Sequence, residues 1–249
     1  MSILRTSAVA VVISGGIILM LSFGIRSSHG VFLQPISTDL GWSREIFAFT
    51  IALQNLFWGI AQPFAGMVAD RFGSGRVIVG GAIMFAAGNM IMGYATTPLV
   101  AHFSAGLLVG VGVAGCGFSI VLAAIGRSVP AEWRSMALGF ASAGGSLGML
   151  VMVPLGQEFI QEYGWSQTLI ILAALSFLMV PLAAMLVGKL EVPIDTQPQT
   201  IKESLREATG HNGFLFLNAG YFVCGFHVAF IVTHFPAYVV DLGLTPEPV

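Results

Sequence analysis

The sequence predicts an all-α membrane protein. Of its 249 residues 56% are hydrophobic and only 9% are charged, and the mean hydropathy is +0.88. This composition excludes a soluble domain with an ordinary polar surface. The charged residues gather in clusters and leave long uncharged runs at residues 6–25, 46–69, 77–126, 135–157, 163–188 and 208–240. A membrane-spanning helix needs about 20 apolar residues, so every run fits one helix except 77–126, which must fold back once.

Seven helices follow from this division, at residues 8–35, 44–66, 76–95, 98–126, 134–157, 166–188 and 212–240. The first resembles a signal peptide because Arg5 precedes an apolar stretch, but its length and the following spans favour a retained helix. The turn residues Ala95-Thr96-Thr97-Pro98 divide the longest run. A polar stretch with Pro193 and Pro198 separates the sixth helix from the seventh.

The basic residues predict the orientation. With these helices, one side of the membrane receives Arg5, Arg71, Arg76, Arg127, Arg134, Lys189, Lys202 and Arg206, and the other side receives only Arg44. Loops rich in Lys and Arg stay in the cytoplasm. We therefore expect a multi-pass protein of a bacterial-type inner (plasma) membrane with a cytoplasmic N-terminus, and the lipid bilayer as its surroundings.

The connection between the second and third helices has a distinctive pattern, Gly66-Met67-Val68-Ala69-Asp70-Arg71-Phe72-Gly73-Ser74-Gly75-Arg76. Glycine allows helices to approach closely, and an acid beside bases can latch a helix end electrostatically. The pattern resembles the signature loop of the major facilitator superfamily of secondary transporters, although that family usually has two bases where this chain has Ser74 and Gly75. The resemblance implies a conformational latch made of Gly66, Asp70, Arg71, Gly73 and Arg76.

The fifth helix extends the resemblance. Trp133-Arg134-Ser135-Met136-Ala137-Leu138-Gly139 leads into a stretch with Gly144, Gly145, Gly148 and Pro154, which is similar to the monocarboxylate and oxalate/formate branch of the superfamily. Small residues let membrane helices move against one another at close range, but any tightly packed membrane helix also needs them. In the fourth helix Gly106 stands where many family members have an Arg, so a latch or proton-coupling role of that Arg is not implied here.

Such transporters have two six-helix halves, each built of two inverted three-helix repeats. The resemblance therefore implies a six-helix bundle over 1–190, a cytoplasmic linker over 191–211, and the first helix of an incomplete C-terminal bundle over 212–249. On this interpretation the chain lacks the C-terminal half of the same transporter. A natural half-transporter that dimerises is the alternative.

Arg26 is the strongest substrate-binding candidate. A cation at the centre of a membrane helix costs about 2.5–3.5 kcal/mol on insertion scales, so it tends to face a cavity or a partner. If the first helix is short, Arg26 lies near the outer interface and extends toward water; if the helix continues to Pro35, Arg26 lies near its midpoint. Its planar guanidinium suits a carboxylate. Apart from Glu45, at the start of the second predicted span, no Asp or Glu falls inside the predicted spans.

Further candidates are polar residues on other helices. His227 and His234 lie on one face of the seventh helix, where they could bind an anion, titrate during transport, or hydrogen-bond a neighbouring helix. Asn55 is a substrate-binding candidate that could equally join helices, as could Gln54, Gln62 and Asn89. His29 and His102 fall near the outer ends of their helices and are assigned no role.

The predicted function is secondary active transport of a small organic anion, such as a monocarboxylate, by alternating access. A proton or a counter-anion is the candidate coupled solute. The alternatives are efflux of hydrophobic or cationic compounds and a non-transporting membrane receptor or assembly protein. We find no nucleophile–base pair, phosphate loop or metal-ligand spacing, so we expect no enzyme, no cofactor, no metal and no nucleic-acid partner.

Overall fold

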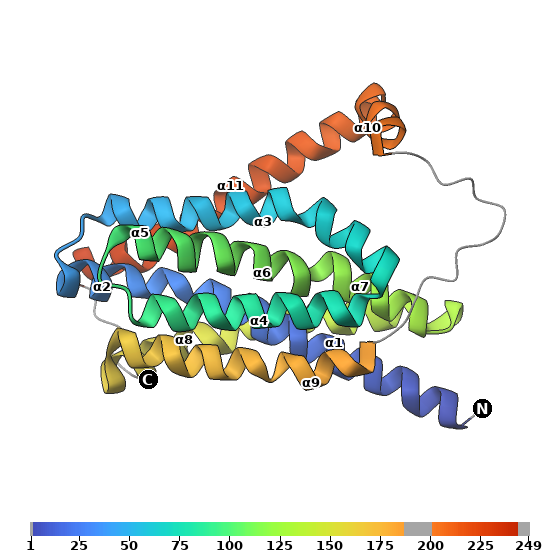
Figure 1. Ribbon diagram of the computed structural model, residues 1–249, viewed down its shortest axis with the longest axis horizontal. Helices are drawn as coiled ribbons and strands as arrows, with labels where there is room; N and C mark the ends of the chain where they lie inside the picture. The colour runs from blue at the N-terminus through green and yellow to red at the C-terminus, as the bar shows by residue number, and fades with distance from the viewer. Residues whose placement is uncertain (1, 187–200, 244–249) are drawn as a thin grey trace. The chain divides into compact units, whose positions relative to one another are not determined.

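The computed structural model describes residues 2–186 and 201–243, which are helical with short connections and contain no strand. The chain divides into two compact units, residues 1–190 and residues 191–249. In the first unit the long helices run side by side along one axis (Figure 1).

The first span is longer than predicted. It consists of α1 (Ser2–Ser28), the 3₁₀ turn η1 (His29–Phe32) and α2 (Leu33–Leu40), and its apolar part covers Ala8–Leu40. The expected end at Pro35 is wrong because this proline occupies the first turn of α2, where its missing N–H is tolerated. The helix ends instead at Gly41, whose φ of 64° is left-handed.

The predicted loop at 66–76 is reduced to a single residue. The helix α3 (Arg44–Phe72) continues through Asp70 and Arg71, and α4 (Ser74–Gly93) begins directly after Gly73. The predicted span ends before Asp70 and Arg71 because these residues are charged. Both side chains are exposed in the last turn of α3, so they do not interrupt the helix. Gly73 makes the connection with φ 94° and ψ 144°, a conformation that glycine adopts without steric cost.

The fourth predicted helix, 98–126, is interrupted. It comprises α5 (Pro98–Ala101), the π-helical turn η2 (His102–Leu108), α6 (Val109–Cys116) and α7 (Phe118–Ser128). Gly117 separates α6 from α7 with extended backbone angles, φ −84° and ψ 179°. π-Helical turns are rare and often occur at functional sites.

The fifth and sixth predicted helices form α8 (Ala131–Phe177), which bends sharply at Gly164 with φ 77° and ψ 165°. The expected end at residue 157 is wrong, since the first half of α8 continues to this bend. It therefore includes Glu158 and Glu162, contrary to the prediction of helices without acids, but both side chains are exposed. The short helices α9 (Met179–Ala183) and η3 (Ala184–Leu186) complete the first unit as described.

The second unit contains α10 (Ile201–Gly210) and α11 (Asn212–Asp241). Residues 191–200 of the predicted linker and 244–249 at the end of the chain lie outside the described residues. By length and hydropathy, five segments of the described chain could cross a membrane: Ala8–Leu40, Ser74–Gly93, Pro98–Ser128, Ala131–Leu186 and Asn212–Asp241. The fourth of these contains the bend at Gly164. The helix α3 has 29 residues but is not among the five.

Glycines bring α1 and α8 into backbone contact. A Cβ atom on Gly148 would lie 2.1 Å from the carbonyl oxygen of Met20, and one on Gly144 would lie 2.5 Å from that of Gly16. The helices α4 and α6 meet in the same way, because a Cβ on Gly81 would lie 2.7 Å from the Gly112 carbonyl oxygen. These contacts leave no space for side chains, so they hold α1 against α8 and α4 against α6 in the unit that contains the polar residues described next.

Candidate substrate-binding site

Arg26 points into the first unit from the middle of its span. The candidate membrane-spanning segment Ala8–Leu40 has its midpoint at residue 24, two residues from Arg26. The Arg26 Nη2 donates a hydrogen bond to Asn55 Oδ1 at 2.5 Å. Its Cζ lies 4.6 Å from the centroid of the Trp58 ring, a distance typical of a cation–π contact. Arg26 therefore packs against α3 and does not extend along its own helix toward water.

The polar face of α3 is made by Asn55, Trp58 and Gln62. Their spacing of three and four residues places them one above the other on a helix. Asn55 Nδ2 donates to the Ile51 carbonyl at 2.8 Å, and Trp58 Nε1 donates to Gln62 Oε1 at 3.0 Å. Both bonds join residues of α3. The Asn55 amide is thereby held in a defined orientation beside Arg26, and the Gln62 amide is held beside the Trp58 indole, which Arg26 contacts.

Aromatic rings support this polar group. Phe23, one turn before Arg26, meets Trp58 edge to face with 5.8 Å between ring centroids, and its ring lies 4.4 Å from that of Phe118. Phe118 opens α7 directly after the break at Gly117. A Cβ on Gly145 of α8 would lie 2.7 Å from the Phe118 ring. The break at Gly117 thus places the Phe118 ring against Phe23, which in turn packs on Trp58 beside Arg26.

Hydrogen-bond donors outnumber acceptors in this group. The buried Arg26 Nε and Gln62 Nε2 have no hydrogen-bond partner among the described residues. No Asp or Glu in the described part of the chain forms an ion pair with Arg26, and the two amide oxygens of the group, Asn55 Oδ1 and Gln62 Oε1, already accept one hydrogen bond each. Buried donors are normally satisfied. A fixed cation with spare donors is therefore suited to an anion rich in acceptor oxygens.

A second polar network surrounds His29, one turn beyond Arg26. Gln54 Nε2 donates to the Ala105 carbonyl at 2.8 Å and contacts His29 Nδ1 at 3.1 Å, while His29 Nε2 contacts Asn89 Oδ1 at 2.9 Å. Asn89 Nδ2 donates to the Phe85 carbonyl at 2.9 Å. Because both amides must turn their NH₂ groups to carbonyls, His29 accepts at Nδ1 and donates at Nε2. The network is satisfied only by this neutral tautomer.

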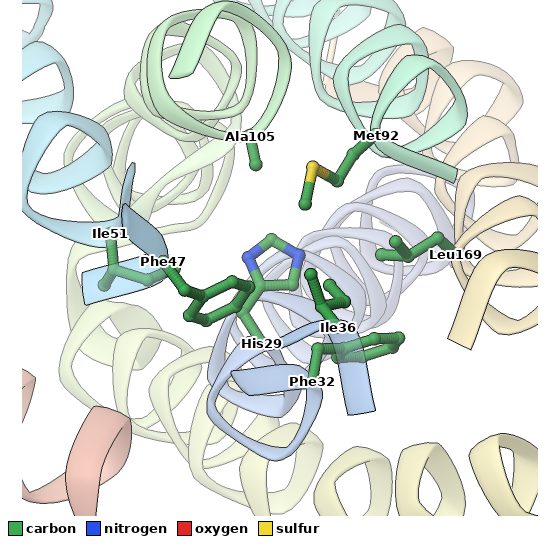
Figure 2. A pocket seen from close by; sticks show the side chains of 8 residues that line it. All are labelled: His29, Phe32, Ile36, Phe47, Ile51, Met92, Ala105 and Leu169. Atoms are coloured by element: carbon green, nitrogen blue, oxygen red, sulfur yellow. The ribbon is translucent and has the colours of Figure 1, made fainter. Parts of the chain in front are cut away.

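His29 is a structural residue that the sequence did not single out. Its network joins η1 to α3, α4 and the π-helical turn η2. A cavity of about 10 Å³ lies beside the ring, which points between apolar side chains in Figure 2. This space holds one water molecule at most, and both ring nitrogens are already engaged. The lining residues are His29, Phe32, Ile36, Phe47, Ile51, Met92, Ala105 and Leu169. We assign no ligand to this cavity.

His102, which is also assigned no role from the sequence, has a hydrogen-bond partner too: its Nδ1 lies 2.8 Å from Thr50 Oγ1.

The predicted latch residues lie at the end of α3 and the start of α4. Asp70, Arg71 and Arg76 are exposed. Arg76 Nη1 donates weakly to the Phe72 carbonyl at 3.5 Å, and Asp70 forms no ion pair with any described residue. A Cβ on Gly66 would meet no atom within 4 Å. The expected close approach at Gly66 is therefore absent from the described residues, whereas Gly73 is required by its positive φ.

The histidine candidates belong to the second unit. They lie seven residues apart on one face of α11, where His227 Nδ1 donates to the Val223 carbonyl at 2.9 Å and His234 lies 4.9 Å from the Phe230 ring, centroid to centroid. The structure thus brings Arg26 and Asn55 together, and the meeting of Arg26 with His227 and His234 remains a prediction. Trp58 contacts Arg26 and Gln62 contacts Trp58, although neither residue is a substrate-binding candidate by sequence. Their helical spacing from Asn55 is the signal in the sequence that could have found them.

Comparison with known proteins decides the family. The family model of the Major Facilitator Superfamily matches residues 15–248. The chain belongs to this superfamily. Superfamily relatives include Monocarboxylate transporter 13 of Bos taurus, 29% identical over 244 residues, which are 92% of this chain and 53% of the relative. The uncharacterised transporter YcxA of Bacillus subtilis (strain 168) is 26% identical over 230 residues, 87% of this chain and 54% of that protein. This chain therefore spans about half the length of these relatives.

Solved structures show the same fold. A bacterial homologue of the human lysosomal transporter Spinster, in an inward-facing and unoccupied conformation, matches with a TM-score of 0.73 over 96% of this chain and 57% of that chain, at 18% identity. A peptide transporter in complex with sulfate matches with a TM-score of 0.62 over 91% of this chain and 46% of the other, at 16% identity. The fold is that of multi-pass membrane transporters, and the relatives named here are transporters and not enzymes.

Proposed function

We propose that this chain carries the N-terminal share of the substrate site of a secondary active transporter for a small organic anion, such as a monocarboxylate. The observation that carries the proposal is Arg26, a cation in the middle of an apolar span with a buried, unpartnered Nε and no ion pair among the described residues. The names of several relatives, monocarboxylate transporters 13 and 1 among them, point to the same substrate class.

The remainder of the proposed site lies in the C-terminal half of the transporter. The helix α11 is the first helix of that half. Alternating access requires two halves that rock about a midplane site. His227 and His234 would face Arg26 across that site and complete the positive surface around the carboxylate. A proton or a counter-anion is the proposed coupled solute, and the latch at Asp70 closes the cytoplasmic side.

The proposed orientation is a cytoplasmic N-terminus in the inner (plasma) membrane. It follows from the asymmetry of Lys and Arg between the two sides. Ser43 and Ser128 are exposed at opposite ends of the helices, so cysteines placed there test the assignment once Cys224, the exposed native cysteine, is replaced by Ser. Labelling of Ser43→Cys only from the cytoplasmic side would reverse the orientation.

The decisive experiment is uptake of labelled monocarboxylates by the complete transporter in proteoliposomes, with and without a pH gradient. Arg26→Lys keeps the charge but loses the planar fork, so we expect an affinity about tenfold lower, equal to about 1.4 kcal/mol. Arg26→Gln should nearly abolish anion uptake because it removes the only charge of the group. Arg206→Gln, at an exposed position of α10, is the matched control and should transport normally.

Two outcomes would contradict the proposal. Uptake of anions by Arg26→Gln at the wild-type rate would remove Arg26 from the site. Transport of hydrophobic cations with no anion uptake would favour the efflux alternative, and ligand binding without any transport would favour a receptor.

A further inference from the structure

We infer that Gln62 is a second substrate ligand, an uncharged donor that binds an oxygen atom at the end of the substrate remote from its carboxylate. The inference rests on the proposed function, because it takes the carboxylate to be held by Arg26. Gln62 would be a further residue of the substrate site and would make it selective. Among short carboxylates, the transporter should prefer those that carry a neutral oxygen at the far end of the carbon chain.

The orientation of the Gln62 amide is fixed by chemistry. The indole N–H of Trp58 can only donate, so the amide must turn its oxygen to Trp58 Nε1, 3.0 Å away. The NH₂ group then points away from Trp58. It is buried and has no acceptor in the described part of the chain.

An unsatisfied buried NH₂ group is not explained by packing. Leaving a buried donor without a partner is unfavourable, so such groups are rare in folded proteins. Three buried polar side-chain atoms lack a partner among the described residues: the hydroxyl oxygen of Ser37 and the two nitrogens Arg26 Nε and Gln62 Nε2. Both side chains contact the same indole, Arg26 at its face and Gln62 at its nitrogen. Their coincidence at one tryptophan indicates a single ligand with acceptor atoms at two places.

The two donors differ in the oxygen that they favour. Arg26 carries a charge and suits the carboxylate. Gln62 is neutral and lies seven residues from Asn55, about 10 Å along α3, so it is directed at a separate part of the ligand. A hydroxyl or carbonyl oxygen is its natural partner, because a second carboxylate would have no cation opposite it in the described group. The substrate would therefore extend along Trp58 from Arg26 to Gln62.

The test compares butyrate with 4-hydroxybutyrate as competitors and as labelled substrates of the complete transporter. We expect the wild type to take up 4-hydroxybutyrate at least tenfold more efficiently. Gln62→Met removes the donor at nearly constant volume and should abolish the preference, so that 4-hydroxybutyrate is taken up no better than butyrate. Gln62→Glu still accepts from Trp58 but places a negative charge near the anion, so uptake of both should fall. Gln161→Glu, an exposed site on α8, is the charge-matched control.

The outcomes separate this inference from the proposed function. No preference in the wild type, or an equal loss of both substrates in Gln62→Met, would overturn the role of Gln62, while loss of uptake in Arg26→Gln would still support the anion site. Normal anion uptake in Arg26→Gln would instead overturn the anion site itself, whatever Gln62 does.

Discussion

At the scale of single residues, hydrogen-bond partners that can only donate or only accept fix the orientation of the buried amide side chains. Carbonyl oxygens orient Gln54, Asn55 and Asn89, and the indole of Trp58 orients Gln62. His29 is thereby confined to the neutral tautomer that donates from Nε2. Protonation would place an N–H against the NH₂ of Gln54, two donors facing each other, so His29 is suited to holding helices together and not to carrying a proton.

Asn89→Leu tests the His29 network. The substitution leaves the buried His29 Nε2–H without an acceptor, which costs about 1–3 kcal/mol. We expect a lower midpoint of thermal unfolding for the detergent-solubilised transporter, with substrate affinity retained in the folded fraction. Gln161→Leu removes an amide from an exposed position and should leave the midpoint unchanged. Equal midpoints for Asn89→Leu and the wild type would show that the network does not stabilise the fold.

Part of the site could be predicted from the sequence. Arg26 is conspicuous because a charge inside an apolar span needs an explanation, and Asn55 is one of few amides in the spans. His29, Trp58 and Gln62 could not be assigned in the same way, because their roles depend on the register of α1 against α3 and on the rotation of each helix. Hydrophobic periodicity does not fix either quantity in helices that are apolar on every side.

At the scale of helices, the packing of α1 against α8 depends on particular glycines and not on the small-residue pattern as a whole. Gly148 lies against the Met20 carbonyl, whereas a Cβ on Gly139 of the same helix would meet no atom within 4 Å. The spacing of small residues indicates a packing face, but only the structure separates the glycines that touch another backbone from those that face open space.

Gly148→Ala is therefore expected to disrupt the bundle and Gly139→Ala to be tolerated. The methyl group at Gly148 must displace the backbone of α1, a rigid neighbour, and overpacking of this kind typically costs about 1–3 kcal/mol. Thermal unfolding of the two variants in detergent measures the difference. A wild-type midpoint for Gly148→Ala would mean that the two helices separate more easily than the contact distance indicates.

Helix ends show why sequence boundaries fail in this protein. Uncharged runs mark the apolar layer, but α3 continues to Phe72 and the first half of α8 to the bend at Gly164. Helices end where the backbone changes direction, and here glycines with positive φ make the change at residues 41, 73 and 164. These three changes of direction therefore lie at glycines, whereas the charged residues Asp70, Arg71, Glu158 and Glu162 lie inside helices.

At the scale of the whole molecule, Asp70 has no evident purpose within the first unit. It is exposed in the last turn of α3, where the negative end of the helix dipole disfavours an acid, and no described residue pairs with it. An acid that does not stabilise its own helix fits a contact with another part of the transporter, as the family resemblance of the latch implies.

Asp70→Asn should accordingly slow transport without lowering stability. Removing the charge relieves the unfavourable interaction with the helix end, worth about 0.3–1 kcal/mol, and would weaken the proposed latch contact. Uptake rates and thermal unfolding of the complete transporter measure the two effects. Glu158→Asn, at an exposed acid of α8, is the control. A wild-type uptake rate in Asp70→Asn would leave the latch without support.

The stacking of Arg26 on Trp58 gives this transporter an intrinsic optical reporter. Indole emission responds to a nearby charge and to the polarity around the ring, and Trp58 touches both Arg26 and Gln62. The other three tryptophans of this sequence, Trp42, Trp133 and Trp165, can be replaced by Phe, together with any in the rest of the proposed transporter, in a background that keeps Trp58. Emission of the remaining indole would then follow occupancy of the site directly, without a label, and would record substrate arrival separately from the movement of the two halves.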